Sequence, residues 1–129
     1  DYGYDRRRLL DPRVRANGTL ACYRRHRVHR DALRDPGEQD LTAHVDFTAL
    51  ARAGESLGLE TVAFTRQALW LTALGIFDEI DPDDLASRQQ VASLLDPEGM
   101  GEEIRVLVQA KGVDASTLID LEVLGTPGL

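Results

Sequence analysis

Residues 35–50 read DPGEQDLTAHVDFTAL, and this stretch passes from a turn directly into an amphipathic helix. Pro36-Gly37 is a turn signal. Asp46 is a good helix N-cap because its carboxylate can accept a hydrogen bond from the first helical turn, and Gly58 is a good stop. The apolar side chains in between fall on one helical face, which we expect to face the core: Phe47, Leu50, Ala51 and Leu57.

The flanking segments alternate between strand and helix patterns. Residues 19–24 and 104–110 alternate in the manner of strands, and 60–64 is a short β-prone segment. A second helix is predicted over 68–74, capped by Thr65 and buried on more than one face. A third helix runs to residue 95 from a cap at Asp81, with Pro82 in its first turn. Residues 113–129 fit either helix or strand. This order predicts an α/β fold.

The size and composition of the chain fit one ordinary globular domain. It has 129 residues, and 43% of them are hydrophobic. No apolar run approaches the roughly 20 residues that cross a bilayer, so we expect no membrane association. The single cysteine, Cys22, is compatible with a reducing cytosol, and we expect a cytoplasmic location. The chain begins at Asp1 and its only methionine is Met100, so we interpret it as a piece of a longer protein.

The charge of −7 is unevenly distributed along the chain. Residues 1–34 contain ten arginines and four aspartates, whereas the remainder contains five basic and eighteen acidic residues. A solvated basic surface is the ordinary explanation of such an arginine-rich head. A surface that docks a partner protein is an alternative. Nucleic-acid binding is disfavoured, because the head has no lysine and no aromatic RNA-binding motif and the remainder is acidic.

Two clusters of polar side chains could carry chemistry. Cys22, His26, His29 and His44 are zinc-ligand types, but their spacing does not match the usual zinc modules, and ordinary hydrogen-bonding roles are favoured over a metal site.

The second cluster is Asp40, Thr42 and Asp46, which lie at even offsets. An extended segment over 40–46 would therefore point all three to one side, where two carboxylates and a hydroxyl can bind a guanidinium or an ammonium group or act as a base. The alternative is local: Asp46 caps its helix, Thr42 bonds nearby backbone, and Asp40 closes the Pro-Gly turn.

The first four residues, DYGY, would suit the ligand crevice at the carboxyl ends of strands in an α/β sheet. The sequence contains no G-x-G-x-x-G, no P-loop, no G-x-S-x-G and no H-E-x-x-H motif. From its own residues the chain therefore shows no phosphate-binding loop and no nucleophile elbow.

Several stretches together resemble one protein family. They are DYGY at 1–4, TLACYRRHRVH at 19–29, DPGEQDLTAHVDFTAL at 35–50, LG at 74–75 and MGEEIRVLVQAKG at 100–112. In this order and spacing they resemble the carboxyl-terminal third of the MidA family. Members of that family are class I S-adenosylmethionine-dependent methyltransferases related to the mitochondrial complex I assembly methyltransferase.

The resemblance implies a Rossmann-like class I methyltransferase fold, a mixed sheet with flanking helices, of which residues 1–129 form the C-terminal portion. Residues 1–3 would follow the fifth strand, and the strands near 19–24 and 104–110 would form the far edge of the sheet. The resemblance implies S-adenosylmethionine as cofactor. Its glycine-rich binding loop would lie upstream, so we expect no cofactor-binding residue in this chain and no activity from it alone.

The resemblance also implies transfer of methyl groups to an arginine of a protein, such as a respiratory complex I subunit. Five residues fall in the matching string of the family. We assign Asp40 and Asp46 as catalytic, and His26, His29 and Thr42 as substrate-binding, with His44 ranked lower. A carboxylate pair could hold the guanidinium and offset its charge. No metal ion is expected, and homo-oligomerisation is left open. The alternative reading is a non-catalytic module that docks a partner through the arginine-rich head.

Overall fold

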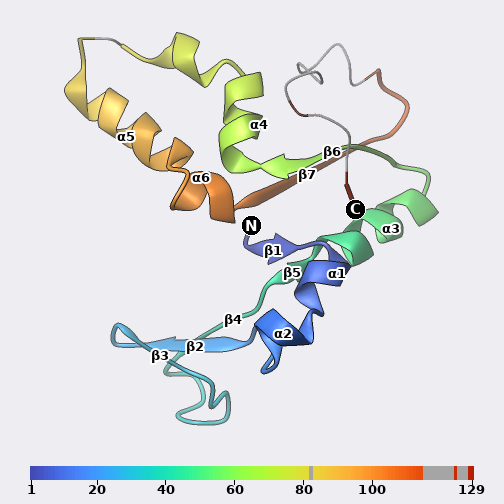
Figure 1. Ribbon diagram of the computed structural model, residues 1–129, viewed down its shortest axis with the longest axis vertical. Helices are drawn as coiled ribbons and strands as arrows, with labels where there is room; N and C mark the ends of the chain where they lie inside the picture. The colour runs from blue at the N-terminus through green and yellow to red at the C-terminus, as the bar shows by residue number, and fades with distance from the viewer. Residues whose placement is uncertain (82, 115–123, 125–127) are drawn as a thin grey trace.

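The computed structural model describes residues 1–81, 83–114, 124 and 128–129, and it has an α/β fold (Figure 1). The strands are β1 (Gly3–Tyr4), β2 (Ala21–Arg24), β3 (Arg27–His29), β4 (Asp40–Thr42), β5 (Val45–Asp46), β6 (Glu60–Arg66) and β7 (Arg105–Ala110). The helices are α1 (Arg6–Leu9), α2 (Pro12–Arg15), α3 (Phe47–Ser56), α4 (Gln67–Ala73), the 3-10 turn η1 (Ile76–Glu79), α5 (Leu85–Leu95) and α6 (Met100–Glu103).

The central strands form the mixed arrangement that was expected. β1 pairs with β5 in parallel, whereas β6 and β7 pair antiparallel. An antiparallel bridge between Tyr2 and Ile104 joins the start of β1 to the start of β7, so the order across the middle of the molecule is β5-β1-β7-β6. Helices flank these strands: α3 packs against β6 and β7 on one side, and α4 and α6 contact β6. The predicted mixed α/β sheet with flanking helices is confirmed.

A separate three-stranded sheet stands away from the central strands, at the bottom of Figure 1. Its order is β3-β2-β4, and both pairings are antiparallel. The predicted strand over 19–24 is present as β2, but the expectation that it shares a sheet with the strand over 104–110 is wrong. Both edges of β2 are already paired with its sequence neighbours β3 and β4, so no edge is left for β7.

The helix predicted after Asp46 is confirmed as α3. The Asp46 carboxylate accepts a hydrogen bond from the Ala49 N–H at 2.9 Å, and Gly58 ends the helix with a φ of 81°. The buried face differs from the expected one: Phe47, Thr48 and Ala51 are buried, whereas Leu50 and Leu57 are 49% and 71% exposed. The rings of Phe47 and Phe64 lie 5.1 Å apart and fix α3 on β6.

The caps of the second and third helices lie later in the chain than predicted, at Arg66 and Asp84. Thr65 does not cap α4; it is a buried residue of β6, because the strand continues to Arg66. No residue of α4 is fully buried, so the expected burial of that helix is also wrong.

α5 begins at Leu85 with Asp84 as its cap, and Asp81 instead accepts a hydrogen bond from the Asp83 N–H at 2.9 Å. Pro82 and most of the segment 113–129 lie outside the described residues. Among the described residues, no helix has the length and apolar character needed to cross a membrane.

Three short helices were not predicted: α1, α2 and α6. Asp5 and Asp11 cap the first two by accepting hydrogen bonds from the Arg8 and Arg13 N–H groups, both at 3.0 Å. Each helix has only four residues. A single turn carries too little periodicity to be read from a sequence.

The pairing of β1 with β5 depends on a glycine at position 3. A Cβ atom built on Gly3 would lie 2.5 Å from the Val45 carbonyl oxygen and 2.7 Å from the Phe47 ring. We predict that Gly3→Ala destabilises the protein by about 1–3 kcal/mol, the usual cost of overpacking. Urea unfolding measures this. Gly128→Ala, where an added Cβ meets no atom of the described residues within 4 Å, is the control, and an equal stability of both variants would contradict the prediction.

Candidate functional site

The five residues predicted from the sequence fall into two places. Asp40 and Thr42 lie in β4, His29 lies in β3, and His26 lies in the turn between β2 and β3. Asp46 lies at the end of β5, next to β1. The extended segment expected over 40–46 is interrupted, because neither residue 43 nor residue 44 is in a strand and because β4 and β5 pair with different strands. Asp40 and Thr42 therefore belong to a different sheet from Asp46, and the three side chains do not lie along one continuous strand.

Asp40 and Thr42 are exposed and free in the part of the chain that the structure describes. Neither side chain makes a hydrogen bond or an ion pair with a described residue. Their partners across the ladder are Tyr23 and Ala21, so the two side chains share one face of β4. A shallow depression of about 430 Å³ joins Asp40, Tyr23 and Arg24. This face presents an acidic and a hydroxyl group that a ligand can reach.

The turn between β2 and β3 has an uncommon backbone. Arg25 and His26 have φ values of 48° and 63°, as a two-residue hairpin of the I′ type requires. Asn-Gly is the usual pair in such turns, and side chains with a full Cβ are strained there by about 1–3 kcal/mol each. His26 is exposed at the tip of the hairpin. Strain of this kind clusters at binding sites. Arg25 of this turn lines the depression beside Asp40, whereas His26 does not.

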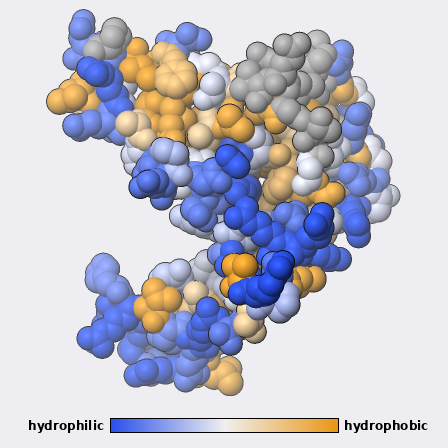
Figure 2. Space-filling model, in the orientation of Figure 1, coloured by the Kyte–Doolittle hydropathy of each residue, from blue (hydrophilic) through white to orange (hydrophobic). Residues whose placement is uncertain are grey.

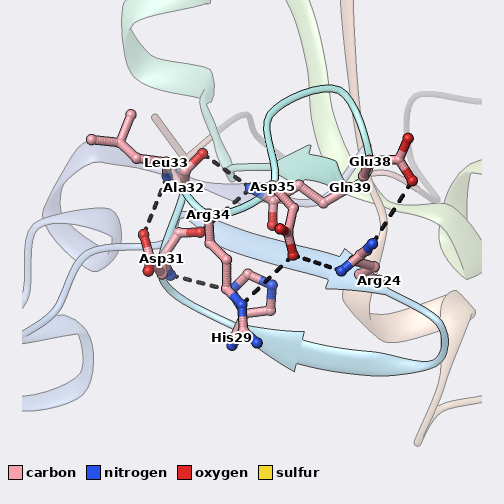
Figure 3. Close-up of polar contacts among 9 residues, drawn as sticks. All are labelled: Arg24, His29, Asp31, Ala32, Leu33, Arg34, Asp35, Glu38 and Gln39. Atoms are coloured by element: carbon pink, nitrogen blue, oxygen red, sulfur yellow. Dashed lines mark hydrogen bonds and ion pairs between the residues drawn. The ribbon is translucent and has the colours of Figure 1, made fainter.

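The loop after β3 explains most of the other polar residues of the stretch 35–40 (Figure 3). The Arg24 guanidinium binds Asp35 at 2.6 Å and approaches Glu38 at 3.8 Å. The Gln39 amide donates a hydrogen bond to the Ala32 carbonyl at 3.0 Å, and His29 Nδ1 accepts one from the Asp31 N–H at 3.3 Å. These side chains fasten the loop to the hairpin. Because His29 Nδ1 accepts the hydrogen bond from Asp31, only Nε2 of the His29 ring is available to a ligand.

The Asp46 carboxylate is already engaged by two groups. Oδ1 accepts the hydrogen bond from the Ala49 N–H, and Oδ2 binds the Arg6 guanidinium at 2.7 Å. Burial alone would raise the pKa of Asp46, but the Ala49 hydrogen bond and the Arg6 guanidinium outweigh it and lower the pKa below its ordinary value. The charged Asp46 carboxylate thus stabilises the local structure and is also a candidate for binding a substrate guanidinium.

A cluster around Tyr4 lies beside Asp46 at the end of β1. Tyr4 is buried, and the guanidinium groups of Arg8 and Arg15 lie 4.9 and 4.4 Å from the centroid of its ring. The His44 ring lies 5.3 Å from the Tyr4 ring, and the Tyr4 hydroxyl donates to Glu103 at 3.3 Å. Two buried atoms of the cluster, Arg15 Nε and His44 Nδ1, have no hydrogen-bond partner among the described residues.

The sequence pointed to this cluster only weakly. DYGY suggested a crevice residue at Tyr4, and His44 was ranked low. Arg8, Arg15 and Glu103 were missed, because they come from three separate elements and no local pattern connects them. The weak DYGY signal was the one that could have found the site.

The described residues contain no group of three or more His, Cys, Asp or Glu side chains arranged to hold a metal ion. The antiparallel register brings Cys22 opposite His29, while His26 lies in the turn. The chain reverses at Arg25 and His26, so Cys22 and His29 lie on adjacent strands.

The double engagement of Asp46 leads to a stability prediction. Asp46→Ala removes the helix cap and should cost about 1 kcal/mol, within a range of about 0.5–2 kcal/mol. Asp46→Asn keeps an oxygen that caps α3 and loses only the charge that holds Arg6, so it should cost less, because the pair is partly exposed. Urea unfolding of both variants checks this order, and a larger loss for asparagine than for alanine would contradict it.

His44 should make stability depend on pH. Burial, and next the charge of Arg15, lower the pKa of His44 below its ordinary value, although Glu103 acts in the opposite direction. The unfolded chain therefore binds more protons just below about pH 6.5, and stability falls as pH falls through that window. His44→Phe, which keeps a ring on Tyr4, should lose less stability than the parent between about pH 7.5 and 5.5. Thermal unfolding midpoints across this range test it, and identical slopes would refute it.

Comparisons with known proteins place the chain in a family. Residues 1–65 match the family model Methyltransf_28, described as "Putative S-adenosyl-L-methionine-dependent methyltransferase". A crystal structure from Burkholderia thailandensis, of a COG1565 superfamily member and candidate methyl transferase bound to S-adenosyl-homocysteine, is 40% identical with a TM-score of 0.78. A native structure of an uncharacterized COG1565 superfamily protein from the same organism is also 40% identical, with a TM-score of 0.80.

Both structures align with 88% of this chain, whereas the chain covers 31% and 32% of them. The chain therefore spans about a third of the length of these relatives. No match was found among curated proteins. The family match extends over half of the chain and includes the β1–β5 pair, the hairpin sheet and α3. The chain belongs to the Methyltransf_28 family of S-adenosyl-L-methionine-dependent methyltransferases.

Proposed function

We propose that this chain is the substrate-facing part of an S-adenosylmethionine-dependent methyltransferase. The observation that carries the proposal is the 40% identity, over 88% of the chain, to a protein that binds S-adenosyl-homocysteine, the product left when the cofactor has lost its methyl group. The Rossmann-like architecture of the class agrees with the mixed α/β fold. Because the chain spans about a third of that protein, the activity is proposed for the complete enzyme.

The residues described here do not form a cradle for the cofactor. The sequence has no glycine-rich loop of the kind that lets a backbone approach a nucleotide. The glycine at the start of β1, Gly3, is closed off by the Val45 carbonyl and the Phe47 ring. We therefore assign no cofactor contact to this chain. S-adenosylmethionine supplies an electrophilic methyl group when bound, and the role proposed for this chain is to hold the acceptor.

The acceptor proposed here is an arginine of a protein, such as a respiratory complex I subunit, on the resemblance to the MidA family. The open face of β4 supports it, because Asp40 and Thr42 are exposed and make no hydrogen bond or ion pair with a described residue. A carboxylate and a hydroxyl two residues apart can accept hydrogen bonds from a planar guanidinium. His26 lies at the tip of the neighbouring hairpin, where it would contact residues that flank the arginine. His29 is paired with Cys22 and therefore lies on the face of this sheet opposite Asp40 and Thr42, where it would contact a different part of the acceptor protein.

The two candidate carboxylates differ in availability. Asp46 already binds a guanidinium, that of Arg6, so a substrate arginine would have to displace Arg6. That contact illustrates the pairing proposed for the substrate, with nitrogen to oxygen distances of 2.7 and 2.8 Å. Asp40 faces solvent and requires no displacement. Between the two, Asp40 is the better candidate for direct contact with the acceptor.

This assignment predicts a separation of methyl transfer from cofactor binding in the complete enzyme. Asp40→Ala removes the exposed carboxylate without breaking any contact among the described residues, so it should lower methyl transfer to the protein acceptor by about 100-fold. Asp46→Asn, which keeps the helix cap, should also lower methyl transfer, but by less than Asp40→Ala, because the Asp46 carboxylate already binds Arg6. Affinity for S-adenosyl-homocysteine should stay near that of the parent in both variants, as measured by calorimetry.

Glu98→Gln is the matched control, because Glu98 is an exposed carboxylate between α5 and α6 and its side chain makes no hydrogen bond or ion pair with a described residue. It should transfer methyl groups at close to the parent rate. Equal losses of methyl transfer and cofactor affinity in Asp40→Ala would contradict the proposed contact with the acceptor.

A further inference from the structure

One groove among the described residues is lined by arginine side chains. It has a volume of about 1010 Å³ and lies between α1 and α2 on one side and α3 on the other, and Gly128 and Leu129 also line it. Five arginines line this groove, which we call the Arg groove: Arg6, Arg7, Arg8, Arg13 and Arg52. All five are exposed. Figure 2 shows the corresponding strongly hydrophilic surface around α1 and α3.

Most of this positive charge is not neutralised within the described residues. Arg6 is paired with Asp46, and Arg13 with Asp11. No ion pair joins the guanidinium groups of Arg7, Arg8 or Arg52 to a carboxylate in the described ranges. Two aspartates line the groove, and both are occupied as helix caps, Asp5 on α1 and Asp11 on α2. The groove therefore keeps an excess of unpaired positive charge on a fixed scaffold.

The positions of the arginines suit a chain of carboxylates. Arg52 comes from α3 and the other four come from α1 and α2, so the positive charges lie on both walls of the groove. Guanidinium groups bind carboxylates in a fork geometry that is stronger than an ordinary hydrogen bond. Leu10, which is 66% exposed, and Pro12 add apolar surface for the aliphatic parts of a peptide.

A nucleic acid fits the Arg groove less well. No aromatic side chain of the described residues lines it, so these residues offer no platform on which bases could stack. Outside residues 1–34 the chain carries eighteen acidic and five basic residues, which would repel an extended polyanion. A short acidic peptide segment would place its negative charge beside the arginines of the groove and away from the acidic remainder of the chain.

We propose that the Arg groove binds an acidic segment, rich in Asp or Glu, of the methyl-acceptor protein; that the partner is the acceptor rests on the proposed function. The groove adjoins the candidate site through α1. Arg6 binds Asp46 and Arg8 lies over Tyr4, so an acidic segment in the groove would be anchored next to the residues at the ends of β1 and β5. The groove selects the acceptor by charge, while the acceptor side chain is held elsewhere.

The test uses the complete enzyme and two fluorescent peptides, one rich in glutamate and one with glutamine at the same positions. Arg7→Glu combined with Arg52→Glu reverses two unpaired charges on opposite walls without touching an ion pair. We expect the parent to bind the glutamate peptide, with affinity that falls as salt rises, and the double variant to bind it about tenfold more weakly. Arg88→Glu, an exposed arginine on α5 without an ion pair in the described ranges, is the control and should bind like the parent.

Three results would overturn the proposal: equal binding of the two peptides, tighter salt-dependent binding of an RNA oligonucleotide that the double variant loses, or concentration-dependent self-association that the double variant abolishes. Peptide binding needs no cofactor and no turnover, so it can succeed even if the enzyme transfers no methyl group. Conversely, the double variant is compared with the parent in both assays. Loss of glutamate-peptide binding supports the Arg groove, and methyl transfer to a short arginine peptide at the parent level supports the separate acceptor site.

Discussion

The Asp46 carboxylate holds together three parts of this structure. One of its oxygens caps α3 through the Ala49 N–H, and the other binds Arg6 at the start of α1. The backbone of Asp46 pairs with that of Tyr4 in the short parallel ladder between β1 and β5. A two-residue ladder is weak by itself, so the side-chain contacts on either side of it matter. Asp46 fixes the position of α1, and therefore of one wall of the Arg groove, together with Thr48, whose Oγ1 accepts a hydrogen bond from the Arg6 N–H at 2.8 Å.

Local signals in the sequence were sufficient to predict the elements that have clear start and stop residues or a clear alternation. The cap at Asp46 and the stop at Gly58 located α3, and the alternation in 104–110 located β7. They failed where several residues could serve the same purpose: Asp81 and Asp84 are both good caps, and the chain uses Asp84. The grouping of strands could not be read locally at all, since the pairing of β2 with β3 and β4 is decided by a tight turn with positive φ at Arg25 and His26.

The candidate site was predictable by residue type but not by geometry. The spacing of Asp40, Thr42 and Asp46 suggested one face, and a break at residues 43 and 44 divides them between two sheets. The structural alternative was right for Asp46 as a cap, and the turn at Pro36-Gly37 is closed instead by the Glu38 N–H and the Asp35 carbonyl at 3.0 Å. The cluster around Tyr4 depends on contacts between α1, α2 and the segment before β5, and no single stretch encodes it.

The division of charge bears directly on how such an enzyme could take a cationic acceptor. Arginines on α1, α2 and α3 would repel a substrate arginine, so a guanidinium is not expected to enter through the Arg groove. The exposed carboxylate on β4 lies on a different sheet, beyond the segment that joins β4 to β5. A protein with an acidic stretch beside its arginine would bind both the Arg groove and the carboxylate on β4. A free cationic peptide would bind only the carboxylate. Selectivity then arises from the separation of the two charges along the acceptor, because neither surface alone distinguishes one arginine from another.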